Sequence, residues 1–266
     1  MAIIRNEGYF VSEWLWFHRL VGVEKFYIAL HDTEDDTIEK MERLPFRDDI
    51  HLLRLSGRGT YYWGAHRLMF LEQYKEEIEW MIICDADEFF FNPQKIDLKT
   101  VLQEFDDIDC GGVVVPWTVF GLNGYIDRPP LPITDHLVRC SHHLVSIKGI
   151  LKTSMFDGTG EGHLGHLMKT TVPYLLQDKT PYHGKGDTVL ERRDHKIKCH
   201  HYQVRGMLDI IRRAKQAAEN RWYNIEDEQY PYDIWASIAC EPWRNVLDTS
   251  ATLYSKELKE LLEGYR

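Results

Sequence analysis

The first 120 residues alternate between short apolar runs, which are typical of buried strands, and longer segments whose apolar side chains recur at helical spacing. The predicted strands cover residues 2–4, 25–30, 50–55, 80–84 and 112–117, and the predicted helices cover residues 9–20, 35–44, 63–78 and 98–105. Strands that alternate with helices indicate an α/β fold with a parallel sheet covered on both faces. Ligands of such sheets bind beyond the carboxyl ends of the strands, so we expect the functional site there.

The pattern loosens after Gly121, where Gly, Pro and Asn become frequent. A Gly-rich and His-rich stretch covers residues 157–166, and long loops of this kind are usually functional or disordered. Two more helices are predicted, an amphipathic one over residues 206–222 and a final one over residues 253–262.

Composition excludes several classes of protein. With 44% hydrophobic residues and 33 aromatic residues (8 Trp, 14 Tyr and 11 Phe), the 266-residue chain can bury a core and is not disordered. The net charge of −10 argues against a nucleic-acid partner, although residues 185–221 carry ten Lys and Arg against five Asp and Glu and could face an anionic ligand. The apolar runs fall far short of the roughly 20 residues of a membrane span.

The first residues of the chain and its cysteines indicate the cellular compartment in which the protein is expected. Arg5, Asn6 and Glu7 interrupt the first apolar run, so no signal peptide is predicted. The five cysteines are scattered without a C-x-x-C pair, which is typical of reduced thiols. We therefore expect a cytoplasmic protein, with peripheral docking at the inner face of a membrane left open.

One segment points to a metal. The apolar residues 80–84, predicted as a central strand, run directly into Asp85, Asp87 and Glu88. Alternation along a strand would point Asp85 and Asp87 to the same side. Clustered carboxylates repel one another unless a cation neutralises them, and oxygen ligands suit Mg²⁺ or Mn²⁺. The alternative is a solvated acidic turn that caps the following helix.

A series of motifs resembles one group of enzymes. The motifs are Arg5-Asn6-Glu7, Glu13-Trp14-x-x-x-His18, Gly22-Val23-x-x-Phe26-Tyr27-Ile28, Asp85-Ala86-Asp87-Glu88-Phe89 with Pro93, Trp117-x-x-Phe120-Gly121, Lys148-Gly149-Ile150-Leu151-Lys152, His163 with His166, and His201-Tyr202 followed by a Lys-rich helix. In this order, over about residues 3–221, they resemble the GT-A-fold glycosyltransferases, and among these the family 92 and related family 2-like proteins. The family's Asp-Asn pair after the second strand is absent, since Leu30-His31 stand there; Asp32 could take over its contact to the nucleotide.

The resemblance implies a GT-A-like, Rossmann-like fold, with a mixed, mainly parallel sheet flanked by helices. The domain would cover residues 1–221, with a nucleotide-sugar half over about 1–115 and an acceptor half over about 116–221. Residues 222–266 would form a C-terminal helical extension.

The resemblance also implies transfer of a sugar, with inversion, from a nucleotide diphosphate sugar to a hydroxyl. The expected donor is a UDP-sugar, first UDP-galactose or UDP-glucose, and the acceptor is a glycan, a polysaccharide or a lipid-linked saccharide. Mn²⁺ or Mg²⁺ would be held at the D-x-D motif by Asp85, Asp87 and His201. The residues implied for the nucleotide sugar are Asn6, Glu7, Asp32, Arg67, Asp85, Ala86, Asp87, Lys148 and Arg205. For Asn6 and Glu7 the alternative is capping of the following helix.

An inverting transfer needs a base for the acceptor hydroxyl. The candidates are Asp135, which we favour, Asp157 and Glu161, with His163 behind them. The implied acceptor-facing residues are Trp117, Phe120, Gly121 and His163, and packing in the core is the alternative for Trp117.

Two other functions remain open. His163, His166 and His200 could hold zinc in a hydrolase, although the H-E-x-x-H motif is absent. The chain could also be a binding module that keeps the fold and has lost turnover.

Overall fold

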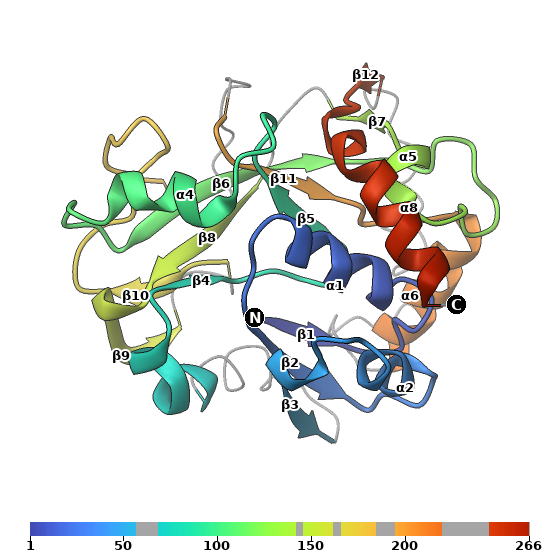
Figure 1. Ribbon diagram of the computed structural model, residues 1–266, viewed down its shortest axis with the longest axis horizontal. Coiled ribbons are helices and arrows are strands. Elements are labelled where there is room, and N and C mark those ends of the chain that lie inside the picture. The colour runs from blue at the N-terminus through green and yellow to red at the C-terminus, as the bar shows by residue number, and fades with distance from the viewer. Residues whose placement is uncertain (57–68, 142–145, 162–165, 185–194, 220–244, 266) are drawn as a thin grey trace.

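A computed structural model describes residues 1–56, 69–141, 146–161, 166–184, 195–219 and 245–265 (Figure 1). Among these residues no helix is both long enough and apolar enough to cross a membrane. The chain builds two main sheets with helices packed around them, an α/β arrangement as predicted.

The first sheet is parallel and follows the predicted alternation. Its strands, in the order β1-β2-β3, are β1 (Ala2–Ile4), β2 (Phe26–His31) and β3 (Ile50–Leu55). The connecting helices are α1 (Val11–Leu20) and α2 (Thr37–Glu42). Gly22, with φ of +98°, directly follows the last turn of α1 and lets the chain turn back toward β2.

The second sheet has five strands and is mixed. In the order β4-β8-β6-β11-β5 they are β4 (Trp80–Ile82), β8 (Ile147–Lys152), β6 (Gly112–Val119), β11 (Lys198–His201) and β5 (Glu88–Phe91). Only β6 and β11 pair in parallel; the other three pairs are antiparallel. The predicted mainly parallel sheet is therefore wrong. A parallel pair needs a long crossover, usually helical, and the helical pattern that marks such crossovers in the sequence stops near residue 105.

Two main-chain hydrogen bonds join the sheets. Met1 donates to the Ile82 carbonyl (2.8 Å), and Cys84 donates to the Met1 carbonyl (3.1 Å). The segment that continues β4 thus lies between the two sheets, in agreement with the predicted central strand. The carboxyl ends of β1, β2 and β4 consequently share one edge.

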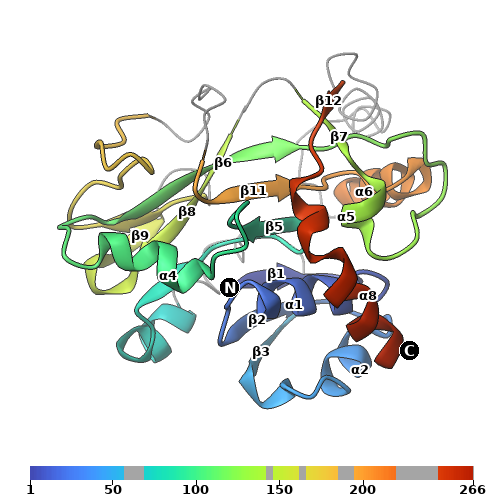
Figure 2. The same cartoon turned by 45° about the horizontal axis from the view of Figure 1, so that its top comes forward.

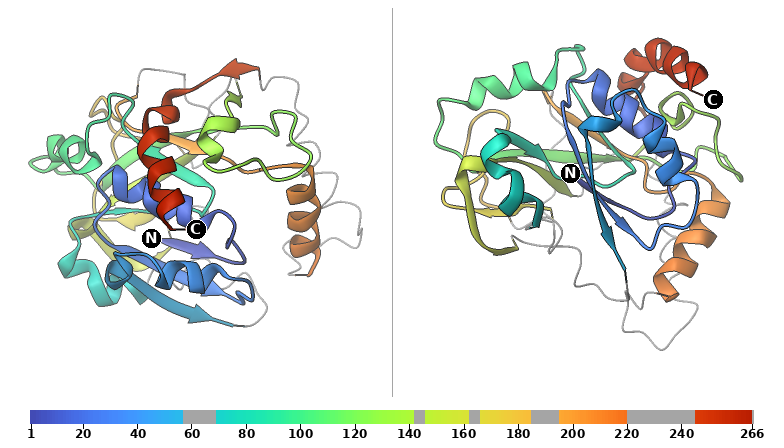
Figure 3. Two further views of the ribbon diagram at one scale, coloured as in Figure 1. Left: turned by 45° about the vertical axis from the view of Figure 1, so that its right-hand side comes forward. Right: turned by 60° about the horizontal axis from the view of Figure 1, so that its bottom comes forward.

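The remaining elements are short. The helices are α4 (Leu98–Leu102), α5 (Ile133–His136), α6 (Met207–Glu219) and α8 (Ser255–Gly264), with 3-10 turns at Arg47–Asp49, Lys75–Glu77, Gln103–Phe105, Thr153–Met155 and Ser250–Tyr254. The short strands are β7 (Arg139–Cys140), β9 (Phe156–Glu161), β10 (Met168–Thr170) and β12 (Val246–Leu247). Helix α8 packs beside α1 (Figure 2), whereas α6 lies at the periphery (Figure 3, left). Residues 63–68 of the predicted helix over 63–78 and residues 222–244 of the predicted extension lie outside the described residues.

Helix α1 holds the start of β5. The Trp14 indole donates to the Glu88 carbonyl (2.9 Å), and the amide of Phe90 donates to His18 Nε2 (3.3 Å). Burial lowers the pKa of His18 to about 3, so the ring is neutral, with Nε2 as acceptor and Nδ1 bonded to the Trp14 carbonyl. Two residues of the family-like motifs thus support the strand that follows the D-x-D.

The same helix also holds the loop before α5. Glu13 is completely buried, and its Oε2 accepts a hydrogen bond from the Ile133 amide (2.9 Å). Burial raises the pKa of Glu13 to about 8. Between about pH 4.5 and 8 the folded chain therefore keeps a proton that the unfolded chain releases, and the free energy of unfolding falls as the pH rises.

We expect Glu13→Gln to reduce this pH dependence, because glutamine keeps the acceptor for the Ile133 amide but does not ionise. In urea unfolding at pH 5, 6, 7, 8 and 9, the free energy of unfolding of the variant should fall less steeply than that of the wild type, by up to about 1.4 kcal/mol per pH unit. The exposed Glu260→Gln serves as the control and should keep the wild-type slope. Equal slopes for Glu13→Gln and wild type would contradict the assignment.

Candidate active site

The loops after β1 and β2 are tied to each other at the carboxyl edge. Asn6 Oδ1 accepts hydrogen bonds from the amides of Glu34 (2.8 Å) and Asp35 (3.3 Å), and Asp35 in turn accepts one from the Gly8 amide (2.9 Å). Asn6 therefore organises the loop after β2 and does not cap α1. The N-cap residue of α1 is Phe10, and this end of the helix has no side-chain capping hydrogen bond. Asp32 follows β2 at the same edge, with a left-handed φ of +40°.

The acidic residues lie in a turn, not in a strand. β4 ends at Ile82, and the Glu88 amide donates to the Asp85 carbonyl (3.1 Å), which closes a turn over Asp85–Glu88. The Asp85 amide donates to Glu88 Oε2 (2.8 Å), so Glu88 reaches back to fix the turn. The strand alternation predicted for Asp85 and Asp87 is therefore wrong, because the chain reverses at this point before β5 begins.

Asp87 and His201 meet at this turn. Strand β11 pairs antiparallel with β5, with His201 opposite Glu88, and the Tyr202 amide donates to the Asp87 carbonyl (2.8 Å). His201 Nε2 lies 3.5 Å from Asp87 Oδ1, and both side chains are at least nine-tenths buried. His201 Nδ1 has no hydrogen-bond partner within the part of the chain that the structure describes. Two of the three predicted metal ligands are thus brought together from distant parts of the sequence.

Trp117 borders this pair. Its partly exposed indole lies 4.3 Å from the His201 ring and 4.9 Å from the His166 ring, measured between centroids. His166 lies 3.3 Å from the Ser146 hydroxyl, and the Lys148 ammonium lies 5.6 Å from the indole centroid. The predicted acceptor-facing tryptophan therefore stands between the candidate metal pair and a second histidine.

Asp85, the third predicted ligand, faces a lysine. Its Oδ2 lies 2.8 Å from Lys148 Nζ, which also lies 3.4 Å from Glu88 Oε2. Within the described residues no group of three or more His, Cys, Asp or Glu side chains is arranged to hold a metal ion. The residues present fit a site in which the protein supplies two ligands and a bound phosphate supplies others, which is the usual way proteins bind Mg²⁺.

Glu7 and Arg205, both implied as nucleotide contacts, bind each other. Arg205 is completely buried; its guanidinium lies 2.8 Å from Glu7 Oε2 and 3.9 Å from the Phe10 ring centroid. Asp209 and Arg212 of α6 extend this network, and Arg212 approaches Glu7 Oε1 at 3.5 Å. The pair ties the loop after β1 to the start of α6.

The other predicted site residues are dispersed. Phe120 is completely buried against the rings of His200 and Tyr202, and Gly121 is buried beside it, so both contribute to the core. Ala86 is buried in the turn. Arg67 and His163, with the side chain of Glu161, lie outside the described residues.

The two described base candidates each bind a lysine. Asp135 accepts a hydrogen bond from Ser255 and lies 2.6 Å from Lys259 of α8. Asp157 lies 2.7 Å from Lys169. These roles in catalysis stay predictions.

His200 and His166 lie on opposite sides of β11, because neighbouring residues of a strand point to opposite faces and His166 lies on the side of His201, against Trp117. His200 is completely buried, with Ser250 and Asp248 at 3.4 and 3.5 Å from Nε2. Burial opposes ionisation of Asp248, but His200 and Ser250 hold the pKa of that carboxyl well below its usual range. This network fastens the C-terminal segment to β11.

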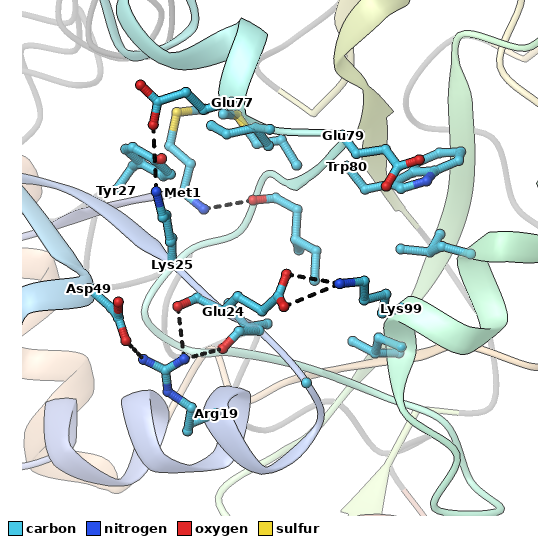
Figure 4. A pocket seen from close by; sticks show the side chains of 17 residues that line it. Met1, Arg19, Glu24, Lys25, Tyr27, Asp49, Glu77, Glu79, Trp80 and Lys99 are labelled. Carbon is cyan, nitrogen blue, oxygen red and sulfur yellow. Dashed lines mark hydrogen bonds and ion pairs between the residues drawn. The ribbon is translucent and has the colours of Figure 1, made fainter. Parts of the chain in front are cut away.

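A cavity of about 700 Å³ opens at the opposite edge, where β1, β2 and β4 begin (Figure 4). Six of its charged lining residues form three ion pairs with one another: Arg19 with Asp49 (2.5 Å), Lys99 with Glu24 (3.2 Å) and Lys25 with Glu77 (3.5 Å). It lies away from the D-x-D turn.

Two residues that contact the predicted site residues, Glu88 and Arg212, were given no such role from the sequence. Glu88 was treated only as a third carboxylate, although it fixes the turn and approaches Lys148. Arg212 lies in the amphipathic helix predicted over residues 206–222 and received no role from the sequence, although it joins the Glu7 network. Their positions in the sequence could have indicated these contacts. Glu88 directly follows the D-x-D motif, and Arg212 lies seven residues after Arg205.

Comparisons with known proteins agree with the resemblance. No protein-family model matches the chain. A glycosyltransferase family 92 protein of Ricinus communis is 28% identical over 108 residues, which is 38% of this chain and 18% of that protein. The chain therefore spans less than a fifth of the length of this curated relative. The resemblance to family 92 stated from the motifs is confirmed.

Solved structures give weaker likenesses. Staphylococcus aureus TarS 1–349 matches with 13% identity and a TM-score of 0.41, over 96% of this chain and 72% of that one. The same protein in complex with UDP matches with 17% identity and a TM-score of 0.39, over 58% and 46%. HddC from Yersinia pseudotuberculosis matches with 11% identity and a TM-score of 0.28, over 74% and 65%. All three TM-scores lie below 0.5, too low to establish a shared fold.

Proposed function

We propose that this chain is a metal-dependent glycosyltransferase with a GT-A-like fold. It would transfer a sugar, with inversion, from a UDP-sugar to a hydroxyl of a glycan, a polysaccharide or a lipid-linked saccharide. The observation that carries the proposal is the meeting of Asp87 and His201 at the carboxyl edge of the strands, beside Trp117. The sequence similarity to a family 92 protein supports the same activity.

Asp87 and His201 would hold Mn²⁺ or Mg²⁺, with imidazole favouring Mn²⁺. Their close approach and their burial fit this role. When bound, the cation acts as a Lewis acid that stabilises the charge developing on the diphosphate leaving group.

The remaining residues of the edge would bind the nucleotide. Asn6 and the Glu7–Arg205 pair fix the loops after β1 and β2, where Asp32 lies exposed enough to accept a hydrogen bond from a hydroxyl. Asn6 and Arg205 would thereby position these loops and leave the direct contact with the nucleotide to Asp32.

In the reaction, the acceptor oxygen forms a bond to the anomeric carbon as the bond from that carbon to the diphosphate oxygen breaks. The hydroxyl proton passes to a base. Ser255, Lys259 and Lys169 compete with the acceptor for the lone pairs of Asp135 and Asp157. We therefore propose Glu161, the third candidate, as the base.

The other two functions receive less support. A zinc hydrolase would require His200 to turn away from Ser250 and Asp248 and to reach the far side of β11, where His166 lies. A binding module without turnover would keep the same metal pair, so only an assay of turnover separates it from the enzyme.

We expect Asp87→Asn to abolish metal-dependent nucleotide binding, because it removes the charged ligand of the metal pair. In a thermal-shift assay with a panel of nucleotide sugars, the wild type should gain more stability from Mn²⁺ and its donor together than from either alone, and the variant should gain none from the pair. The exposed Asp109→Asn is the matched control and should respond as the wild type does. A wild-type response that is equal with EDTA would contradict metal dependence.

For the base, we expect Glu161→Gln to lower kcat by about 10²–10⁴-fold with little change in donor binding, since the amide cannot take the hydroxyl proton. Asp135→Asn should lower the free energy of unfolding by loosening α8 and leave kcat nearly unchanged. Donor turnover with the matching acceptor measures both. A larger loss of kcat in Asp135→Asn than in Glu161→Gln would return the role to Asp135.

A further inference from the structure

Lys148 lies beneath the D-x-D turn in an unusual position for a lysine. It comes from β8, which pairs with both β4 and β6, and only 1% of its side chain is exposed. Lysine is almost never fully buried unless it is paired. Its Nζ contacts two carboxyl groups of the turn, those of Asp85 (2.8 Å) and Glu88 (3.4 Å).

The two carboxyl groups differ in their environment. Glu88 is completely buried, and its Oε2 already accepts a hydrogen bond from the Asp85 amide (2.8 Å). The side chain of Asp85 is 26% exposed and is the closer partner of the ammonium. By distance, Asp85 is therefore the main partner of Lys148.

The turn thus contains two separate side-chain pairs. Asp85 pairs with Lys148 on one side, and Asp87 pairs with His201 on the other. An ammonium at 2.8 Å occupies a carboxylate oxygen that a metal ion would otherwise use. A cation and a divalent metal also repel each other strongly in a poorly solvated site.

We propose that Lys148 is a positioning residue that withholds Asp85 from the metal, so that the D-x-D motif supplies one metal ligand, Asp87, and not two. This inference rests on the proposed function, because it assumes a metal at Asp87 and His201. The ion pair holds the Asp85 carboxylate against Lys148. It also limits the charge of the metal site, so that the diphosphate is needed to complete it.

The variant Lys148→Met tests this role. Its side chain keeps its length and loses its charge, so that no ammonium holds Asp85 away from the metal. Binding of Mn²⁺ alone, without nucleotide, should then become at least tenfold tighter. A purely structural role for Lys148 would weaken Mn²⁺ binding.

The test is a titration of the full chain with Mn²⁺ alone, in which the free Mn²⁺ is followed by electron paramagnetic resonance. Lys148→Arg keeps the charge and should bind Mn²⁺ as the wild type does, and Asp87→Asn should lose binding. The double variant Asp85→Asn/Lys148→Met removes the ion pair as a neutral unit, and its Mn²⁺ affinity should stay within about threefold of the wild type.

Several outcomes would overturn the proposal. Unchanged or weaker binding by folded Lys148→Met would show that Lys148 does not restrain Asp85. A loss of tenfold or more in the double variant would show that Asp85 is itself a ligand. If Lys148→Met fails to fold in far-UV circular dichroism, the double variant decides, because removing a buried ion pair as a unit is better tolerated than removing one partner.

The same titration separates this inference from the proposed function. A wild type that binds no Mn²⁺, alone or with nucleotides in the thermal-shift assay, overturns both. A wild type that binds Mn²⁺ through Asp87, together with a double variant that has lost binding, overturns only the role of Lys148.

Discussion

The antiparallel pairing of β5 with β11 is the contact on which the candidate site depends. Strand β5 directly follows the acidic turn, and β11 lies more than 100 residues later in the sequence. Their register places His201 opposite Glu88, and the Tyr202 amide fixes the Asp87 carbonyl. Since β11 also pairs with β6, the same strand sets Trp117 beside His201. A shift of this register by one residue would turn His201 away from Asp87.

The supports of β5 explain why several motif residues lie outside the site. Trp14 and His18 bond to the main chain of β5, and Glu13 from the same helix bonds to the loop before α5. All three are buried, so their hydrogen bonds are protected from water. The family-like motif that contains Glu13, Trp14 and His18 thus supports the backbone around the candidate site and does not itself line the site.

Sequence reasoning predicts the first half of the fold well. The predicted strands over residues 2–4 and 50–55 coincide with β1 and β3, and the predicted helix over residues 98–105 coincides with α4 and the 3-10 turn that follows it. These elements carry their own periodic pattern, which local spacing reveals. The strands β8 and β11 were not predicted from pattern, because their burial comes from neighbours far away in the sequence. The mixed sheet follows from those same long-range pairs.

For the site, the sequence brought out Asp85, Asp87, Lys148, Trp117 and His201 as candidates, and the structure places all five around one turn. It did not reveal which of them bind one another. Asp85 was grouped with Asp87 from strand alternation, and only the turn at Asp85–Glu88 separates their partners. Likewise Glu7 and Arg205 form an ion pair across almost 200 residues, which no local pattern reports.

The distance along the chain between Asp87 and His201 also sets an order of events during synthesis. A nascent chain that has left the ribosome as far as residue 150 already contains the D-x-D turn and all of β1, β2, β3 and β4. It still lacks β11, so Asp87 has no imidazole beside it and β5 has no neighbour on that side. Translation must therefore pass residue 201 before the pair of Asp87 and His201, the proposed metal site, can form.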